Sequence, residues 1–373
     1  MMWMLLFTLL PLLGIGYVSW HVWCLLPLWW GWKVLAVVLL FSSFLLMFAG
    51  MAGLLDRLPL PVAAAVYEVG TSSVFVLMYL VLIFLILDLL RLVLHLLSCF
   101  HGSMYNVLHD NWWTVGTITV FMVATFLYGN IHYRHKYRQT LTLTTTKPLA
   151  RPLKVVMASD LHIGYHNTRK ELARWVDLIN SEQPDVILIG GDIIDMSMRP
   201  LREERMHEEF HRLKAPVYAC LGNHEYYGGQ PDALQFYRDA GIHLLRDSTA
   251  TVGNLMVIGR DDRTNLRRKP LAEVMKAAGQ KPSALYTVVL DHQPHHLEEA
   301  EQAGVDFQFS GHTHYGQVWP ISWITDAIYE CAFGEHRRGH TRYYVSSGLG
   351  IWGGKFRIGT RSEYVVATIK PDP

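Results

Sequence analysis

Charge is distributed so unevenly along this chain that the distribution constrains its architecture. Of 373 residues, the first 130 include only seven Asp, Glu, Lys or Arg residues, and nearly all the remaining charge follows Ile131. A membrane portion followed by a soluble portion accounts for this division. The sequence therefore predicts an all-α membrane domain over residues 1–130, a linker or strand over residues 131–152, and a soluble domain over residues 153–373.

The first 130 residues contain apolar segments of the length that crosses a bilayer, which is about 20 residues. Four are predicted, at about Trp3 to Trp23, Trp32 to Gly53, Ser73 to Leu97 and Trp112 to Tyr128. The first has no N-terminal Lys or Arg and no convincing cleavage site, so we expect an uncleaved helix rather than a signal peptide. Tryptophans cluster at the segment ends, where their rings favour the headgroup zone.

Four crossings would place both termini on one side of the membrane. The segment after the last crossing contains Arg134, Lys136 and Arg138, and the loop between the second and third crossings adds Arg57. The opposite side offers little beyond Lys33. Because basic residues favour the cytoplasmic side, we expect a bacterial inner-membrane protein with a cytoplasmic soluble domain.

Ionisable residues lie inside the third apolar segment. Asp88 and Arg91 are three residues apart on one helical face, and His95 is one turn further along. An intramembrane ionisable residue indicates a function by default. We instead expect an ion pair that neutralises its own cost, because no second charged crossing offers a relay; the role of the membrane domain stays open.

Composition narrows the classes of function. A formal net charge of +1 argues against a global electrostatic footprint for nucleic acid. Four cysteines in a chain of this length, with no Cys-x-x-Cys pair, form no disulfide framework and favour a reducing compartment. No nucleic-acid partner is expected.

In the soluble portion, short apolar runs are each followed by polar residues and then, in several cases, by a helix-like stretch. This pattern predicts an α/β layered sheet with its functional residues at the carboxyl ends of strands. The residues that follow the runs and offer metal-ligand atoms are Asp160, His162, Asp192, Asn223, His292, His312 and His314. Each stretch alone is typical of an ordinary turn, but their joint occurrence at strand ends is not.

The chemistry of these side chains points to metal-assisted phosphoryl transfer. Imidazoles, carboxylates and an amide oxygen without thiolates suit Mn²⁺, Fe or Zn²⁺. Seven ligands suit two ions, about 3.5 to 4 Å apart, that share one carboxylate, acidify a bridging water and clamp phosphoryl oxygens. His224 is the candidate proton donor to the leaving group, while Asp195 and Glu225 are expected to orient imidazoles or support a loop.

These residues stand in five motifs: Asp160-x-His162, Gly191-Asp192-x-x-Asp195, Gly222-Asn223-His224-Glu225, His292 and Gly311-His312-x-His314. Together the motifs resemble the five-motif signature of the calcineurin-like metallophosphoesterases, over about residues 153 to 369, and most of all its membrane-associated YkuE-like or YaeI-like branch. The resemblance implies a four-layer αββα sandwich and a dinuclear site. It implies that one metal is bound by Asp160, His162, Asp192 and His314, and the other by Asp192, Asn223, His292 and His312. His224 would be the general acid or a phosphate contact, and Asp192 the shared ligand.

Several residues beside this signature are candidates for contact with the substrate. Tyr315 stands where the branch usually has glycine, and the apolar insert that contains Trp319 and Trp323 directly follows the metal histidines. We expect Tyr315, Trp319, Trp323 and Arg357 to contact substrate, and the insert to approach the bilayer, although core packing is the alternative.

The expected reaction is hydrolysis of a phosphodiester or pyrophosphate in a phospholipid-like or nucleotide-lipid substrate. UDP-diacylglucosamine is one candidate, since members of the resembled branch cleave it. A membrane transporter or sensor with a regulatory domain, and a catalytically inactive scaffold, are the alternatives. The intact ligand set opposes the scaffold.

Overall fold

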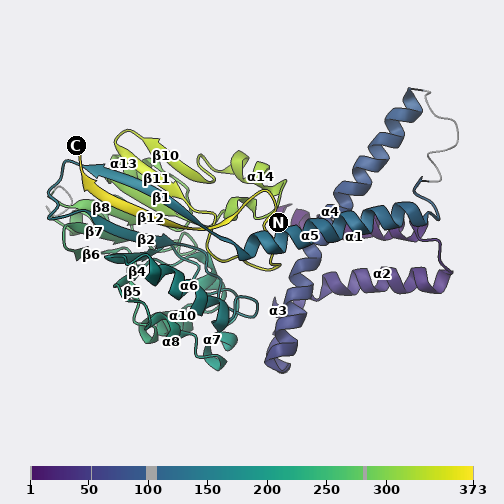
Figure 1. Cartoon of the computed structure of the whole chain (residues 1–373), viewed down its shortest axis with the longest axis horizontal. Helices are drawn as coiled ribbons and strands as arrows, with labels where there is room; N and C mark the ends of the chain where they lie inside the picture. The colour runs from purple at the N-terminus through teal and green to yellow at the C-terminus, as the bar shows by residue number, and fades with distance from the viewer. Residues whose placement is uncertain (1, 52, 98–106, 280–283, 373) are drawn as a thin grey trace. The chain divides into compact units, whose positions relative to one another are not determined.

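The computed structural model describes residues 2–51, 53–97, 107–279 and 284–372. The chain divides into two compact units, Met1–Gly129 and Asn130–Pro373 (Figure 1). The first unit is helical, and the second carries the strands and the polar motifs.

In the part of the chain that the structure describes, the first unit contains four long apolar helices and two short helical segments. They are α1 (Met2–Leu25), α2 (Trp30–Leu45), α3 (Met47–Met51), the 3-10 turn η1 (Leu55–Arg57), α4 (Leu60–Leu96) and α5 (Trp112–Arg134). Within the described residues, three candidate spans are long and apolar enough to cross a membrane: Trp30–Gly50, Leu60–Leu96 and Trp112–Arg134. The helix α4 begins well before the predicted Ser73, with Pro61 in its first turn, where proline is tolerated.

A polar contact joins α1 to α4. The Asp88 carboxylate accepts a hydrogen bond from the Tyr17 hydroxyl (2.7 Å), lies 3.0 Å from His21 Nε2 and accepts one from Arg91 (3.3 Å). His21 is buried and stacks on Phe84. The expected pairing of Asp88 with Arg91 is present, and α1 adds two further partners, Tyr17 and His21, which a search for charged residues overlooks.

The second unit is built on two six-stranded sheets with mixed strand directions, in the orders β1-β12-β2-β3-β4-β5 and β10-β11-β9-β8-β7-β6. The strands are β1 (Lys136–Thr145), β2 (Leu153–Ala158), β3 (Val186–Ile189), β4 (Val217–Ala219), β5 (His243–Leu244), β6 (Ser248–Val252), β7 (Leu255–Gly259), β8 (Tyr286–Leu290), β9 (Phe307–Ser310), β10 (Gly334–Arg338), β11 (Thr341–Val345) and β12 (Ser362–Pro371). The helices are α6 (Arg169–Ser181), α7 (Arg199–Glu203), α8 (His207–Phe210), α9 (Asn223–Tyr227), α10 (Gln230–Asp239), α11 (Leu271–Ala277), α13 (Glu298–Gln302) and α14 (Ile321–Ile328), with the 3-10 turn η3 (His314–Gly316).

The segment predicted as a linker or strand contains β1, an edge strand of the first sheet. It pairs in parallel with β12 from Lys136 opposite Ser362 to Thr145 opposite Pro371. Alternate residues such as Leu141 and Leu143 are buried, as the period of a strand requires. The first and last strands of the unit are therefore neighbours.

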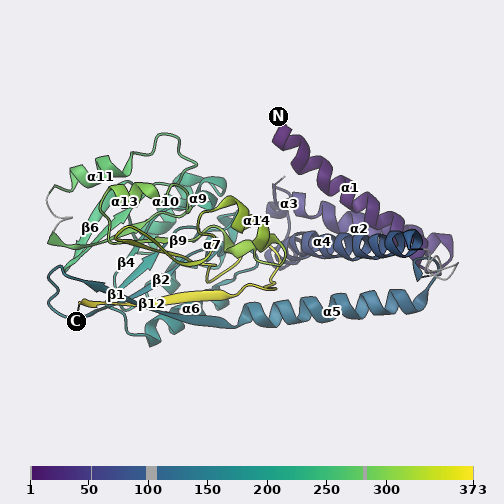
Figure 2. The ribbon, with the colours of Figure 1, turned by 90° about the horizontal axis from the view of Figure 1, so that it is seen from above.

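Both faces of the central strands are buried. In β2, Val155 and Met157 join a core cluster that draws residues from both sheets, whereas Val156 and Ala158 join a cluster with α6 and α10. A further cluster packs α11 and α13 on the second sheet. Two views show α6 and α13 on opposite sides of the strands (Figures 1 and 2). Polar side chains consequently collect at the strand ends.

Candidate metal centre

All seven predicted ligands follow the carboxyl ends of strands in the second unit. Strands β2, β3 and β4 are parallel neighbours, as are β8 and β9, so their ends share an edge within each sheet. Three overlapping groups of possible metal ligands form there. They are Asp160, His162 and His314; His162, Asp192 and His224; and Asp192, His292 and His312.

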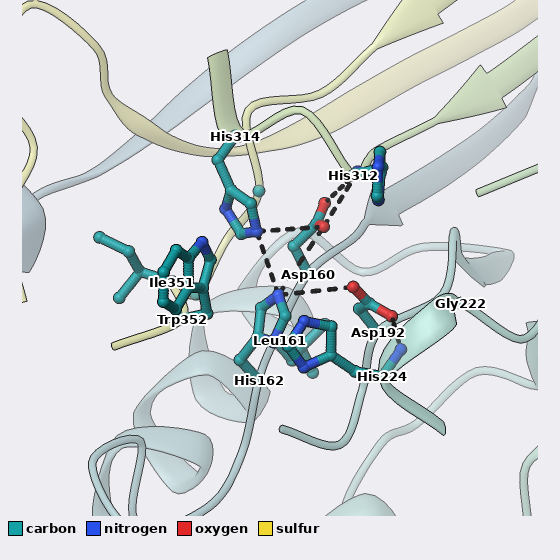
Figure 3. Close-up of polar contacts among 12 residues, drawn as sticks. Asp160, Leu161, His162, Asp192, Gly222, His224, His312, His314, Ile351 and Trp352 are labelled. Carbon is teal, nitrogen blue, oxygen red and sulfur yellow. Dashed lines mark hydrogen bonds and ion pairs between the residues drawn. The ribbon is translucent and has the colours of Figure 1, made fainter. Parts of the chain in front are cut away.

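The first group surrounds a space suited to a cation (Figure 3). His162 Nε2 lies 3.1 Å from His314 Nε2 and 3.6 Å from Asp192 Oδ2, and His314 Nε2 lies 3.5 Å from Asp160 Oδ1. Ligand atoms that bind one ion at about 2.0–2.2 Å lie about 3.0–3.6 Å from one another. These contacts match that spacing.

The third group consists of Asp192, His292 and His312, and Asn223 lies beside it. His292 Nε2 lies 3.0 Å from Asp192 Oδ2, and His312 Nδ1 lies 2.8 Å from Asn223 Oδ1. The other carboxylate oxygen, Asp192 Oδ1, accepts a hydrogen bond from the backbone N–H of His224 (2.9 Å). Asp192 Oδ2 is therefore the atom that faces both the first and the third group, where a ligand shared by two cations would lie.

A hydrogen bond fixes the imidazole of His292 so that its Nε2 atom points toward Asp192. His292 Nδ1 contacts the carbonyl of Gly190 at 2.7 Å, which fixes the ring. His292 Nε2 is buried and makes no hydrogen bond, even though Asp192 Oδ2 is close. A buried nitrogen without a hydrogen bond, within an N/O ligand set, fits a bound divalent cation.

The loops that carry the ligands are strained. Five of the candidate ligands have φ between 44° and 71°, the left-handed region that non-glycine residues avoid. They are Asp160, His162, Asp192, His312 and His314. Such conformations persist where the surroundings fix them, and they cluster at functional sites. Nothing in the sequence pattern predicted them.

A glycine allows the loops to approach each other. A Cβ on Gly222 would lie 2.1 Å from Asp192 Oδ1. The position therefore needs a residue without a side chain.

His224 lies beside the first group and is partly accessible. Its Nδ1 is 3.5 Å from Asp195 Oδ1 and its ring lies edge-on to that of His162. Burial lowers the pKa of the His224 imidazole, but Asp192 and Asp195 outweigh burial and raise it to about 9. Bound cations would oppose that rise, because they neutralise Asp192. In the absence of cations, the two carboxylates thus favour a protonated His224 ring.

Asp195 and Glu225 lie just outside the ligand groups. Asp195 Oδ1 is 3.4 Å from His162 Nδ1; burial raises the pKa of its carboxyl, but the contacts with His162 and His224 outweigh burial and lower it. The Glu225 carboxylate accepts hydrogen bonds from the backbone N–H groups of Gly222 (2.7 Å) and Ile194 (3.0 Å). The Asp195 carboxylate therefore orients imidazoles, whereas the Glu225 carboxylate joins the two loops that follow β3 and β4.

The predicted substrate contact of Arg357 was wrong. Its side chain is fully buried and its guanidinium donates to the carbonyls of His314 (2.7 Å), Ser347 (2.5 Å) and Gly350 (3.0 Å) and to Ser362 Oγ (3.2 Å). Every guanidinium nitrogen is used inside the protein, so Arg357 supports the loops rather than meeting substrate.

The other predicted substrate contacts lie near the surface. Tyr315 stacks on Phe333, and its hydroxyl donates to Asp326 at 3.3 Å. Trp319 and Trp323 are 43% and 65% exposed. They remain accessible to a substrate or to lipid.

Comparison with known proteins agrees with the site. The family model described as calcineurin-like phosphoesterase matches residues 153–316. An uncharacterized metallophosphoesterase of Aquifex aeolicus is 30% identical over 239 residues, which cover 61% of this chain and 90% of that protein. The uncharacterized metallophosphoesterase YkuE of Bacillus subtilis is 26% identical, over 65% of this chain and 90% of YkuE.

A transmembrane protein with a metallophosphoesterase domain from Danio rerio is 32% identical over 58% of this chain and 53% of its own length. The chain spans 61% of the length of the metallophosphoesterases of Helicobacter pylori that it matches. The family match over residues 153–316 covers the strands and loops that carry the candidate ligands. The chain belongs to the calcineurin-like metallophosphoesterase family.

Proposed function

We propose that the chain is a membrane-anchored hydrolase that cleaves a phosphodiester or pyrophosphate with two divalent cations. The position of Asp192 carries this proposal, because its Oδ2 atom faces both groups of imidazoles. The first cation would be held by Asp160, His162, Asp192 and His314, and the second by Asp192, Asn223, His292 and His312. The oxygen and nitrogen ligand set favours Mn²⁺, with Fe or Zn²⁺ as alternatives.

The cations and the surrounding side chains have separate roles in the proposed hydrolysis. When bound, the two cations supply Lewis acidity that acidifies water and stabilises charge on phosphoryl oxygens. His224 holds a proton next to the site and transfers it to the leaving oxygen, while Asp195 orients its ring. Asn223 and His312 are held against each other by their 2.8 Å contact, so these two ligands would meet the second cation already positioned.

The architecture is proposed to be four crossings followed by a four-layer αββα domain on the cytoplasmic side of a bacterial inner membrane. Besides the three candidate spans, α1 is 24 residues long and lacks charged residues. Arg134, Lys136 and Arg138 follow the last span, which supports the cytoplasmic orientation. Helix-facing clusters on both sheets and one cluster drawn from both sheets support the layering.

The surface of α14 supports a lipid or lipid-precursor substrate. Polar Ser322 and Thr325 are buried, whereas Trp323, Ile324 and Ile328 are 57–65% exposed. A helix on a water-facing surface buries its apolar side chains and exposes its polar ones, so α14 has the opposite arrangement. We propose that this apolar face enters the bilayer and admits the acyl part of a substrate such as UDP-diacylglucosamine.

The function is tested by hydrolysis of bis-p-nitrophenyl phosphate by detergent-purified full-length protein, stripped of metal and then refilled. Refilling with Mn²⁺ is expected to restore turnover at least about 10³-fold over the stripped protein, since the ions activate water and stabilise the phosphoryl charge. Binding of cations without turnover of this diester, a monoester or a pyrophosphate would indicate an enzyme narrowly specific for a lipid substrate. Absence of cation binding would contradict the proposal.

Changing Trp319 and Trp323 together to serine is expected to lower kcat/KM on a vesicle-borne phospholipid at least about tenfold, because two rings are removed from the lipid-facing surface. Hydrolysis of bis-p-nitrophenyl phosphate should stay within about twofold. Leu266→Ser is the matched control, since this leucine is 97% exposed outside α14. Equal losses on both substrates would contradict a lipid-facing role.

A further inference from the structure

The last turn of α5 belongs to the catalytic unit. Asn130 Nδ2 donates to the carbonyl of Lys355 (3.0 Å), and Lys136 Nζ donates to the carbonyl of Tyr133 (2.8 Å). Tyr133 itself is 1% exposed, and its hydroxyl donates to Asn167 Oδ1 at 2.6 Å. The end of this candidate span is therefore held to the same body that carries the metal centre.

Asn167 connects this turn to the ligand loop. It is fully buried, and its Nδ2 group donates to the carbonyls of Leu161 (3.0 Å), His162 (3.0 Å) and Ile351 (2.9 Å). An amide nitrogen has two hydrogens, so these three acceptors occupy all of its donor capacity. The amide oxygen faces the opposite way, and the Tyr133 hydroxyl is bonded to it.

The loop that Asn167 holds needs support. Asp160 and His162, two ligands of the first cation, have φ of 54° and 44°. Residues with a Cβ hold such angles only when their surroundings impose them. Asn167 bonds the carbonyl of His162 and that of Leu161, which lies between the two ligands, so its orientation bears directly on their backbone.

We propose that Tyr133 is a positioning residue for the metal centre, acting through Asn167. Its hydroxyl fixes the Asn167 amide, the amide fixes the Asp160–His162 loop, and the loop aims both ligands at the first cation. Without the hydroxyl, Asn167 Oδ1 loses its bonded donor in a buried place, and the loop relaxes to satisfy it. The inference rests on the proposed function only in taking these residues as cation ligands.

The test is Tyr133→Phe in the full-length, detergent-purified protein, with Mn²⁺ binding measured by competition against a chelating dye. Removing a group that supports metal ligands typically weakens affinity 10- to 100-fold. We expect a loss of that size at one of two sites and less than about threefold at the other. The ring is retained, so the core around it is preserved.

Tyr364→Phe is the matched control. Tyr364 is also buried in this unit, and its hydroxyl donates to Glu182 at 3.0 Å, outside the ligand loops. This variant should leave both affinities within about twofold of the parent protein. A general effect of losing a buried hydroxyl would instead weaken binding in both variants, and that result would overturn the proposal.

Asn167→Leu completes the test. If Tyr133 acts through Asn167, Tyr133→Phe has no further effect on affinity in an Asn167→Leu background. Additive losses, or a Tyr133→Phe protein that binds two cations like the parent, would overturn the inference. Two-cation binding by a parent protein that hydrolyses no phosphoester would instead overturn only the proposed function.

Discussion

Asp192→Asn is expected to lower turnover of bis-p-nitrophenyl phosphate at least about 10³-fold, at saturating Mn²⁺, which is the largest catalytic effect of any single change in the chain. An amide keeps the shape of the side chain and can still accept the N–H bond of His224. It removes the negative charge that faces both imidazole groups, so each of the two proposed cations would lose a charged ligand at once. Initial rates and bound metal, counted by elemental analysis, should fall together.

The matched control is Asp185→Asn. Asp185 is also a carboxylate in the sheet-bearing unit, but it bonds Arg151 and the backbone of Lys154, away from the ligands. Its turnover should stay within about twofold of the parent protein. An Asp192→Asn protein that keeps both metals and full turnover would contradict the bridging assignment.

Arg357→Met is expected to give the largest loss of stability, about 4 kcal/mol in the free energy of unfolding. The substitution leaves the buried carbonyls of His314, Ser347 and Gly350 without these donors. For a unit of this size, that loss corresponds to a fall of roughly 10 °C in the unfolding midpoint. Thermal unfolding of the full-length protein in detergent, followed by tryptophan fluorescence, measures it.

Arg138→Met provides the comparison for that measurement. Arg138 forms a pair with Glu182 at an exposed position, and such surface pairs contribute about 0–1 kcal/mol. Its midpoint should move by no more than about 2 °C. Similar midpoints for the two variants would show that the buried hydrogen bonds of Arg357 contribute little.

The meeting of the candidate ligands at one edge could be predicted from sequence, because it depends on where each residue lies relative to its own strand. Each ligand follows a strand, and parallel strands present their carboxyl ends at one edge, so the order of motifs along the chain predicts their meeting. The role of Arg357 could not be predicted in this way. An arginine beside glycine-rich turns has the same sequence appearance whether it faces solvent or donates to buried carbonyls.

Contacts made by uncharged side chains such as Tyr133 and His21 were also beyond prediction. The bond between Tyr133 and Asn167 joins residues 34 positions apart. No spacing rule links a tyrosine at the end of an apolar helix to an asparagine in a loop. The contact of His21 with Asp88, 67 positions apart, was missed for the same reason.

Because β1 pairs with β12, a truncated version of this protein has to begin before β1. The family match begins at residue 153, which suggests a soluble fragment starting there. Such a fragment would lack β1 and would turn β12, a ten-residue strand, into an open edge. Open edges recruit strands from other molecules, so the fragment should aggregate. A soluble version of the enzyme must begin before Tyr133 to keep both the strand and the hydroxyl that contacts Asn167.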